Sequence, residues 1–207
     1  MGDIAALSAA GLLRRRLDRC AGLGIASAAL LAATVLAGCT PEYDWRDIRS
    51  PAGEYWVQLP SRPAVMTRRI HLQGFEVEMT MQGARVKENA YTVALVPLPS
   101  QPADAAGMSP EVILAAMREQ MLRNIGAAPS TATQDTAVDI IDLEGRKVGR
   151  MPLQAVSATG TGRHAELQLR GRFGLWRGHA LQIVAVGPQL DPQQADHFLD
   201  SLRLVRP

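Results

Sequence analysis

Cysteine is scarce in this sequence, since its 207 residues include only Cys20 and Cys39. Two cysteines exclude a scaffold stapled by several disulfides and a zinc site built from many cysteines. A large excess of charge of one sign is also lacking, because the sequence has 22 basic and 20 acidic residues and a net charge of +2. So small a surplus excludes a strong polyanion binder on bulk charge alone. Aromatic residues make up 4% and apolar residues 47%, which is typical of a globular protein of one or at most two small domains.

Recognisable catalytic and metal-binding motifs are absent as well. The sequence contains no H-E-x-x-H, no G-x-S-x-G and no S-x-x-K, and no two of its four histidines lie four residues apart. The Gly-rich stretch 158–163 precedes a predicted strand, whereas a phosphate-binding loop opens a helix, so we expect a hairpin turn there. The sequence therefore predicts a protein that is not an enzyme and has neither a metal site nor a cofactor.

The N-terminal region has the layout of an export signal. A basic cluster comes first and consists of Arg14, Arg15, Arg16 and Arg19. Residues 21–37 follow without a single charge, and the run ends in Leu36-Ala37-Gly38-Cys39. A basic region before an apolar run is typical of a secretory signal, because the positive charges stay on the cytoplasmic side of the membrane.

The four residues Leu36-Ala37-Gly38-Cys39 resemble the lipobox of bacterial lipoproteins. The resemblance implies that the Cys39 thiol receives a diacylglycerol and that a peptidase cuts between Gly38 and Cys39. The new amino group is then acylated, with palmitate as an expected chain. Two alternatives stay open: export with cleavage but no lipid, and an uncleaved anchor, since seventeen residues just span a bilayer core of roughly 30 Å.

Lipidation at Cys39 divides the chain into a signal peptide (1–38), a lipidated cysteine with a tether (39–52) and one domain (53–207). Removal of the signal leaves 18 basic and 18 acidic residues, so nucleic-acid binding loses its support. The predicted location is the bacterial cell envelope, facing the periplasm. By the sorting rule of enteric lipoproteins, Thr40 in place of aspartate favours the outer membrane over the inner one. Tyr43 and Trp45 in the tether either rest at the membrane interface or pack back on the domain.

Alternating apolar residues predict strands over most of the domain. A two-residue turn at Gln73-Gly74 places Leu72 opposite Phe75, and it pairs His71 with Glu76 and Arg69 with Glu78. Helices are predicted after the N-caps Ser109 and Asp191, each of which is followed by proline. Four strands, a helix, four strands and a helix predict an α+β fold. We expect a single antiparallel β-sheet of about six to eight strands flanked by two main helices.

Three stretches resemble PsbP-like proteins and related bacterial envelope lipoproteins. They are residues 53–60 (GEYWVQLP), 91–94 (YTVA) and 197–202 (HFLDSL), and the similarity spans roughly residues 51–206. The resemblance implies an α/β/α sandwich and a non-enzymatic accessory role. It brings no catalytic residues.

Arginines gather in one part of the chain, at Arg163, Arg170, Arg172 and Arg177. Arg170 and Arg172 alternate with apolar residues and therefore share the outward face of one predicted strand. All four arginines are candidates for binding an anion such as a lipid headgroup, lipopolysaccharide or peptidoglycan, with Arg170 and Arg172 forming a strip. The alternative is that they pair with acidic residues across the sheet. Trp176 lies in a predicted turn after Arg172. It either forms an exposed binding site or caps the core.

The sequence thus favours a membrane-anchored envelope lipoprotein with a non-catalytic accessory role, acting through contacts with another envelope protein. One alternative is a binding module for an anionic envelope ligand that uses the arginine-rich strand. The other alternative is an enzyme whose site is assembled from scattered loop residues.

Overall fold

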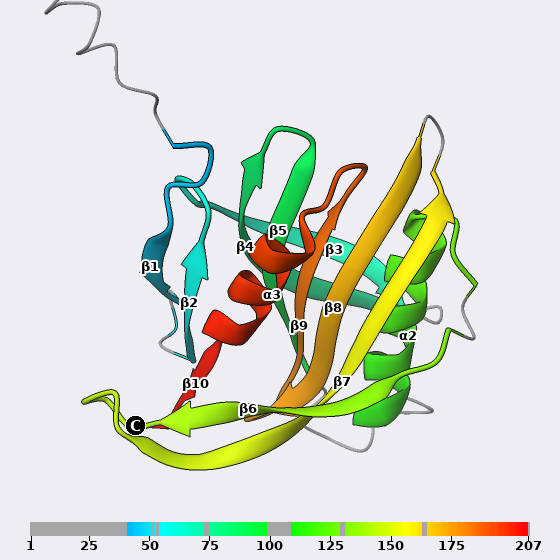
Figure 1. Ribbon diagram of the computed structural model, residues 1–207. Coiled ribbons are helices and arrows are strands. Elements are labelled where there is room, and N and C mark those ends of the chain that lie inside the picture. The colour runs from blue at the N-terminus through cyan, green and yellow to red at the C-terminus, as the bar shows by residue number, and fades with distance from the viewer. Residues whose placement is uncertain are drawn as a thin grey trace, which may run out of the picture. The chain divides into compact units, whose positions relative to one another are not determined.

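Most of the folded unit, Glu42–Pro207, is one β-sheet of ten strands (Figure 1). A computed structural model describes residues 41–50, 52, 54–72, 75–98, 109–128, 131–162 and 165–206. Its elements in chain order are β1 (Arg46–Arg49), β2 (Tyr55–Leu59), β3 (Ala64–Leu72), β4 (Phe75–Val86), β5 (Asn89–Pro97), α2 (Pro110–Asn124), β6 (Gln134–Ile141), β7 (Lys147–Thr161), β8 (Glu166–Trp176), β9 (His179–Gly187), α3 (Pro192–Ser201) and β10 (Arg203–Val205). The predicted signal peptide, Cys39 and Arg163 lie outside the described residues.

The strands follow the order β1-β2-β10-β6-β7-β8-β9-β5-β4-β3. Neighbouring strands run antiparallel except β10 and β6, which run parallel. The last strand of the chain therefore lies between β2 and β6, and it joins the N-terminal pair β1-β2 to the rest of the sheet. The right-handed twist of successive strands accumulates, and the sheet curls into a half-barrel (Figure 1).

The predicted α+β fold, a single antiparallel sheet of six to eight strands flanked by two main helices as in the PsbP-like sandwich, is wrong. The sheet has ten strands, is mixed and curls as a half-barrel, and the described part of the chain has only two helices. One strand was missed because Arg46–Arg49 contains a single apolar residue, Ile48, and shows no alternation. The parallel pair was missed because β10 is only three residues long and its partner lies far away in the sequence.

The predicted register of the β3–β4 hairpin is confirmed. Leu72 lies opposite Phe75 and His71 opposite Glu76. One charge pair differs, because Arg69 donates to Glu76 at 3.4 Å rather than to the residue opposite it, Glu78. The turn residues, 73 and 74, lie outside the described residues.

Both predicted helix starts are confirmed. The Ser109 hydroxyl accepts a hydrogen bond from the Val112 N–H at 3.3 Å, and Pro110 is the first residue of α2. The Asp191 carboxylate accepts from the N–H groups of Gln193 and Gln194 at the start of α3. These side chains satisfy donors that a helix leaves unpaired at its first turn.

The turn predicted at 158–163 is wrong over its first four residues, because β7 continues to Thr161. Gly160 lies against the chain that follows α2, and a Cβ atom there would stand 2.2 Å from the Ile125 carbonyl oxygen. A glycine is therefore needed where the end of α2 passes over β7, and this close approach explains Gly160.

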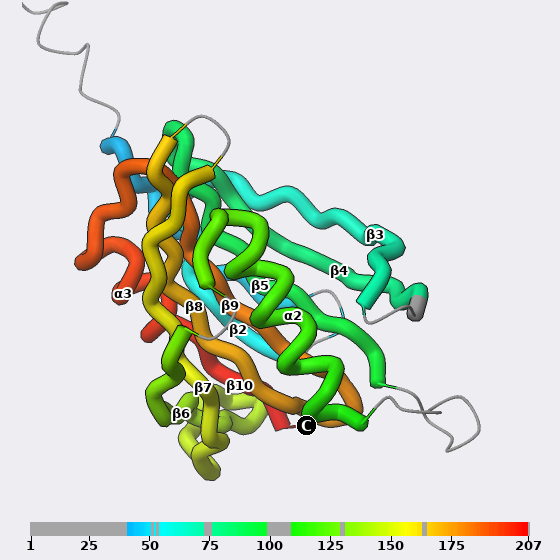
Figure 2. The backbone as a smooth tube through the Cα atoms, turned by 90° about the vertical axis from the view of Figure 1, so that its right-hand side faces the viewer, coloured from blue at the N-terminus to red at the C-terminus, as the bar shows by residue number. Residues whose placement is uncertain are grey.

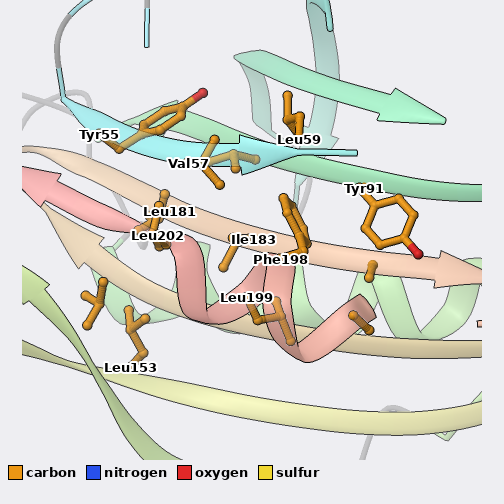
Figure 3. Close-up of a cluster of buried hydrophobic side chains, with 14 of the residues drawn as sticks. Tyr55, Val57, Leu59, Tyr91, Leu153, Leu181, Ile183, Phe198, Leu199 and Leu202 are labelled. Carbon is orange, nitrogen blue, oxygen red and sulfur yellow. The ribbon is translucent and has the colours of Figure 1, made fainter. Parts of the chain in front are cut away.

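The two helices pack on opposite faces of the curled sheet. α3 lies inside the half-barrel, where Phe198 and Leu202 belong to one buried cluster with Leu59 of β2 and Ile183 of β9 (Figure 3). α2 lies outside it and covers apolar residues of β8 and β9, such as Phe173 (Figure 2). Most of the buried side chains belong to the cluster around α3, so the inside of the half-barrel is the main core.

Candidate functional site

The N-terminal strap, Glu42–Ser50, is part of the folded unit, although the sequence predicts a tether for these residues. Glu42 forms an ion pair with Lys87 at 2.9 Å. The Asp44 N–H donates to the Pro60 carbonyl at 2.9 Å, and β1 then pairs with β2 along its whole length. The backbone of the strap is therefore hydrogen-bonded to the sheet from Asp44 onward, and the exposed Glu42–Lys87 pair adds little to this attachment.

The aromatic residues of the strap pack on the domain, which confirms that alternative. The Tyr43 and Trp45 rings stack with centroids 5.8 Å apart. Trp45 also lies edge-on to His197 of α3 at 4.4 Å and to Tyr91 of β5 at 6.3 Å. Burial and the hydrogen bond with Tyr43 raise the pKa of Tyr91 well above its ordinary value. An aromatic cluster thus joins the strap, the sheet and α3.

A groove of about 670 Å³ opens between the strap and the C-terminal end of α3. The groove exists because β10 pairs with β2 only at Tyr55 and Trp56, so the rest of β2 has no strand on that side. Beyond Trp56 the end of α3 takes the place of a strand, and the Gln58 N–H donates to the Ser201 hydroxyl at 3.0 Å. We take this groove as the candidate functional site.

The groove offers two guanidinium groups, an indole ring and carboxylates. The Arg49 guanidinium lies 4.3 Å over the Trp56 ring, close enough for a cation–π contact. Asp47 accepts from the Gln58 side-chain amide at 2.9 Å. Arg203 donates to the carbonyls of Asp200 and Leu202 and so satisfies acceptors at the end of α3. This combination suits hydrogen bonding and ion pairing with a polar partner.

The hydroxyl and imidazole groups of the groove have structural partners. Ser201 donates to the Phe198 carbonyl at 2.6 Å while it accepts from the Gln58 N–H. His197 packs its ring on Trp45. These contacts hold α3 against the strap and β2, which preserves the shape of the groove.

Arg170 and Arg172 do not form a strip on an outward face, and Arg163 lies outside the described residues. Arg170 lies 2.8 Å from Asp196, and Arg172 binds Asp200 and donates to the Leu199 carbonyl at 3.0 Å. The two arginines do share one face of β8, but that face lies against α3. Arg177 is exposed at the β8–β9 turn. The alternative interpretation, pairing with acidic residues, therefore applies to Arg170 and Arg172, with carboxylates on a helix.

Trp176 is the last residue of β8, not part of a turn, and it is buried in the main core. It therefore caps the core, as one of the two alternatives proposed. The groove residues were missed in the sequence analysis. One signal was available: Trp56 stands at the outward position of a strand whose inward residues are Tyr55, Val57 and Leu59, so a large aromatic ring is turned toward solvent.

Among the residues that the structure describes, no three His, Cys, Asp or Glu side chains gather as metal ligands would. None of the helices in the described ranges is long and apolar enough to cross a membrane. A comparison with known protein families finds no match to this chain, and a comparison with curated proteins finds none either.

Proposed function

We propose that this chain is a lipid-anchored protein of the bacterial cell envelope that binds an envelope protein and catalyses no reaction. One observation carries the proposal: Leu36-Ala37-Gly38-Cys39 closes an uncharged run behind a basic cluster. The lipid would be attached to Cys39, and the folded unit would face the periplasm, with the outer membrane favoured. Two or more acyl chains hold a protein stably at a bilayer, since each buried methylene contributes about 0.8 kcal/mol.

The strap supports this proposal, because it fastens the anchored end of the chain to the sheet. A lipid anchor transmits any pull to the first residues of the folded unit. Here the Asp44 N–H donates to the Pro60 carbonyl, and β1 is hydrogen-bonded to β2. The aromatic cluster around Trp45 adds packing on α3 and β5.

The groove supports a role in binding a partner protein. It is an open groove of about 670 Å³, and its walls carry charged, polar and aromatic side chains. Arginine and tryptophan are the residues that most often dominate protein–protein interfaces, and Arg49 and Trp56 lie together on its wall. The anion-binding alternative, in contrast, requires Arg170 and Arg172 to leave the carboxylates of α3.

Metabolic labelling with an alkyne-bearing palmitate tests the anchor. The unaltered protein should become labelled, and Cys39→Ser should not. Cys20→Ser is the matched control, because Cys20 lies in the segment predicted to be removed, and it should label like the unaltered protein. Absence of label from the unaltered protein would refute the lipid anchor.

Crosslinking in intact cells tests the partner-binding role. We expect one abundant crosslinked protein that is lost with the double substitution Arg49→Ala, Trp56→Ala. Arg177→Ala, at an exposed turn away from the groove, should leave the crosslink unchanged. A crosslink that survives the double substitution would show that the partner binds elsewhere.

A further inference from the structure

The connection between Cys39 and the folded unit is very short. Only Thr40 and Pro41 separate Cys39 from Glu42. Three steps between neighbouring Cα atoms, each of about 3.8 Å, reach at most about 11 Å. Because the Asp44 N–H, two residues further on, donates to the Pro60 carbonyl at 2.9 Å, a lipid on Cys39 would hold this end of the folded unit close to the bilayer.

Two loops surround Glu42 at one end of the half-barrel. A shallow cavity of about 190 Å³ is lined by Glu42, by Lys87 and Glu88 of the β4–β5 turn, and by Pro188 and Gln189 between β9 and α3. The Asn89 side-chain amide donates to the Gln189 carbonyl at 2.9 Å and holds the two loops together. The β6–β7 turn lies at the opposite end (Figures 1 and 2).

We infer that the end formed by the β4–β5 turn and by Pro188–Gln189, called here the membrane-facing end, lies against the lipid headgroups. The β6–β7 turn then points into the aqueous space. This inference rests on the proposed lipidation of Cys39, and the structure adds which side of the folded unit the anchor turns toward the membrane.

The tether sets this orientation, and the charges that line the cavity do not. Around the cavity, Lys87 is paired with Glu42, and Glu88 adds a second carboxylate. The described residues that line the cavity therefore form no basic patch of the kind that binds anionic lipids, to which each lysine or arginine contributes about 1 kcal/mol. We therefore expect the same orientation on zwitterionic and on anionic bilayers.

The orientation leaves the groove accessible to a periplasmic partner. β1 begins at Arg46 and ends at Arg49, seven residues beyond Glu42. At about 3.3 Å per residue, an extended chain carries Arg49 up to about 23 Å away from Glu42. Figure 1 shows β1 running away from the end at which the strap enters the folded unit, so the groove wall at Arg49 lies away from the membrane-facing end.

Fluorescence quenching by labelled headgroups tests the inference. A single cysteine is placed at Gln189, at the membrane-facing end, or at Glu144 in the β6–β7 turn, and both positions are exposed. Because Cys39 is acylated and Cys20 is removed, the new cysteine is the only free thiol in the mature chain. The lipidated proteins are labelled with a fluorophore and reconstituted into phosphatidylcholine vesicles that contain a spin-labelled headgroup.

We expect quenching at Gln189→Cys to be several-fold stronger than at Glu144→Cys, and unchanged when a fifth of the lipid is anionic. Equal quenching at the two positions, or stronger quenching at Glu144→Cys, overturns the inference. Insertion of a twelve-residue Gly-Ser linker between Pro41 and Glu42 should abolish the difference, because the tether no longer restricts the distance.

Flotation of the protein with the vesicles separates this inference from the proposed function. A protein that does not float has no lipid anchor, and both proposals fail. A protein that floats but shows no difference in quenching keeps its anchor and refutes the orientation alone.

Discussion

The hydroxyl oxygens of Tyr43 and Tyr91 lie 3.3 Å apart, although 48 positions separate the two residues in the chain. Tyr91 is fully buried in β5, and Tyr43 belongs to the strap. The contact therefore ties the start of the folded unit to the middle of the sheet. The strap packs against the main core, so its loss should lower the free energy of unfolding of the whole unit.

Replacement of Trp45 tests this role of the strap. Trp45 packs on Tyr43, Tyr91 and His197 and is only partly buried. We expect Trp45→Ala to lower the free energy of unfolding by about 2–3 kcal/mol, somewhat less than the cost of truncating a fully buried tryptophan. Urea unfolding followed by circular dichroism measures it. Val65→Ala, at a residue that is 53% exposed, is the control and should cost less than about 0.5 kcal/mol. Equal costs would contradict the structural role of the strap.

Two buried tyrosines predict a loss of stability at alkaline pH. Burial raises the pKa of Tyr55 and of Tyr91 above the ordinary value of 10.0. An acid whose pKa is raised by folding contributes stability below its unfolded pKa, and this stability falls as the pH rises beyond that value. We expect the free energy of unfolding to be lower at pH 11 than at pH 9, with a smaller decrease in Tyr91→Phe. The same decrease in both proteins would exclude Tyr91 as a cause.

Local features of the fold could be predicted from the sequence, because neighbouring residues determine them. The caps at Ser109 and Asp191 and the β3–β4 register depend on side chains within a few positions of each other. The position of β10 in the sheet, in contrast, does not depend on neighbouring residues. Leu204 lies between Tyr55 of β2 and Ile140 of β6, and no local pattern indicates that a C-terminal strand separates them.

The candidate site could not be predicted for the same reason. Arg49 and Trp56 become neighbours only when β1 pairs with β2, and the alternation that indicates a strand is missing from β1. Arg170 and Arg172 were correctly assigned to one face of a strand. Which face α3 would cover depends on how the sheet curls, and a strand pattern carries no information about that.

Truncation of Arg172 distinguishes a structural role from an anion-binding role. Its side chain is 15% exposed and bonds both Asp200 and the Leu199 carbonyl. We expect Arg172→Ala to lower the free energy of unfolding by about 1–2 kcal/mol, because the carbonyl loses its partner. Arg177→Ala, at the exposed turn, should cost less than about 0.5 kcal/mol. If Arg172→Ala left stability unchanged but abolished binding to anionic vesicles, the anion-binding alternative would be favoured.

Gly160 predicts that the crossing of β7 and the end of α2 cannot tolerate a side chain. A Cβ atom at Gly160 would lie 2.2 Å from the Ile125 carbonyl oxygen and 2.7 Å from the Ala127 nitrogen. Both are backbone atoms, so no rotation of a side chain can relieve the clash. We expect Gly160→Ala to lower the free energy of unfolding by about 2–4 kcal/mol, as overpacking that moves the backbone does.

A glycine in the same strand provides the matched control for this substitution. A Cβ atom at Gly149 would meet only the Ile140 side chain, at an ordinary 3.6 Å. Because glycine weakens a strand, Gly149→Ala should be neutral or stabilising by a few tenths of a kcal/mol. Thermal unfolding of the two variants measures the difference. If Gly160→Ala unfolds at the same temperature as Gly149→Ala, then the end of α2 does not pass so close to β7. Close packing would then not require a glycine at position 160.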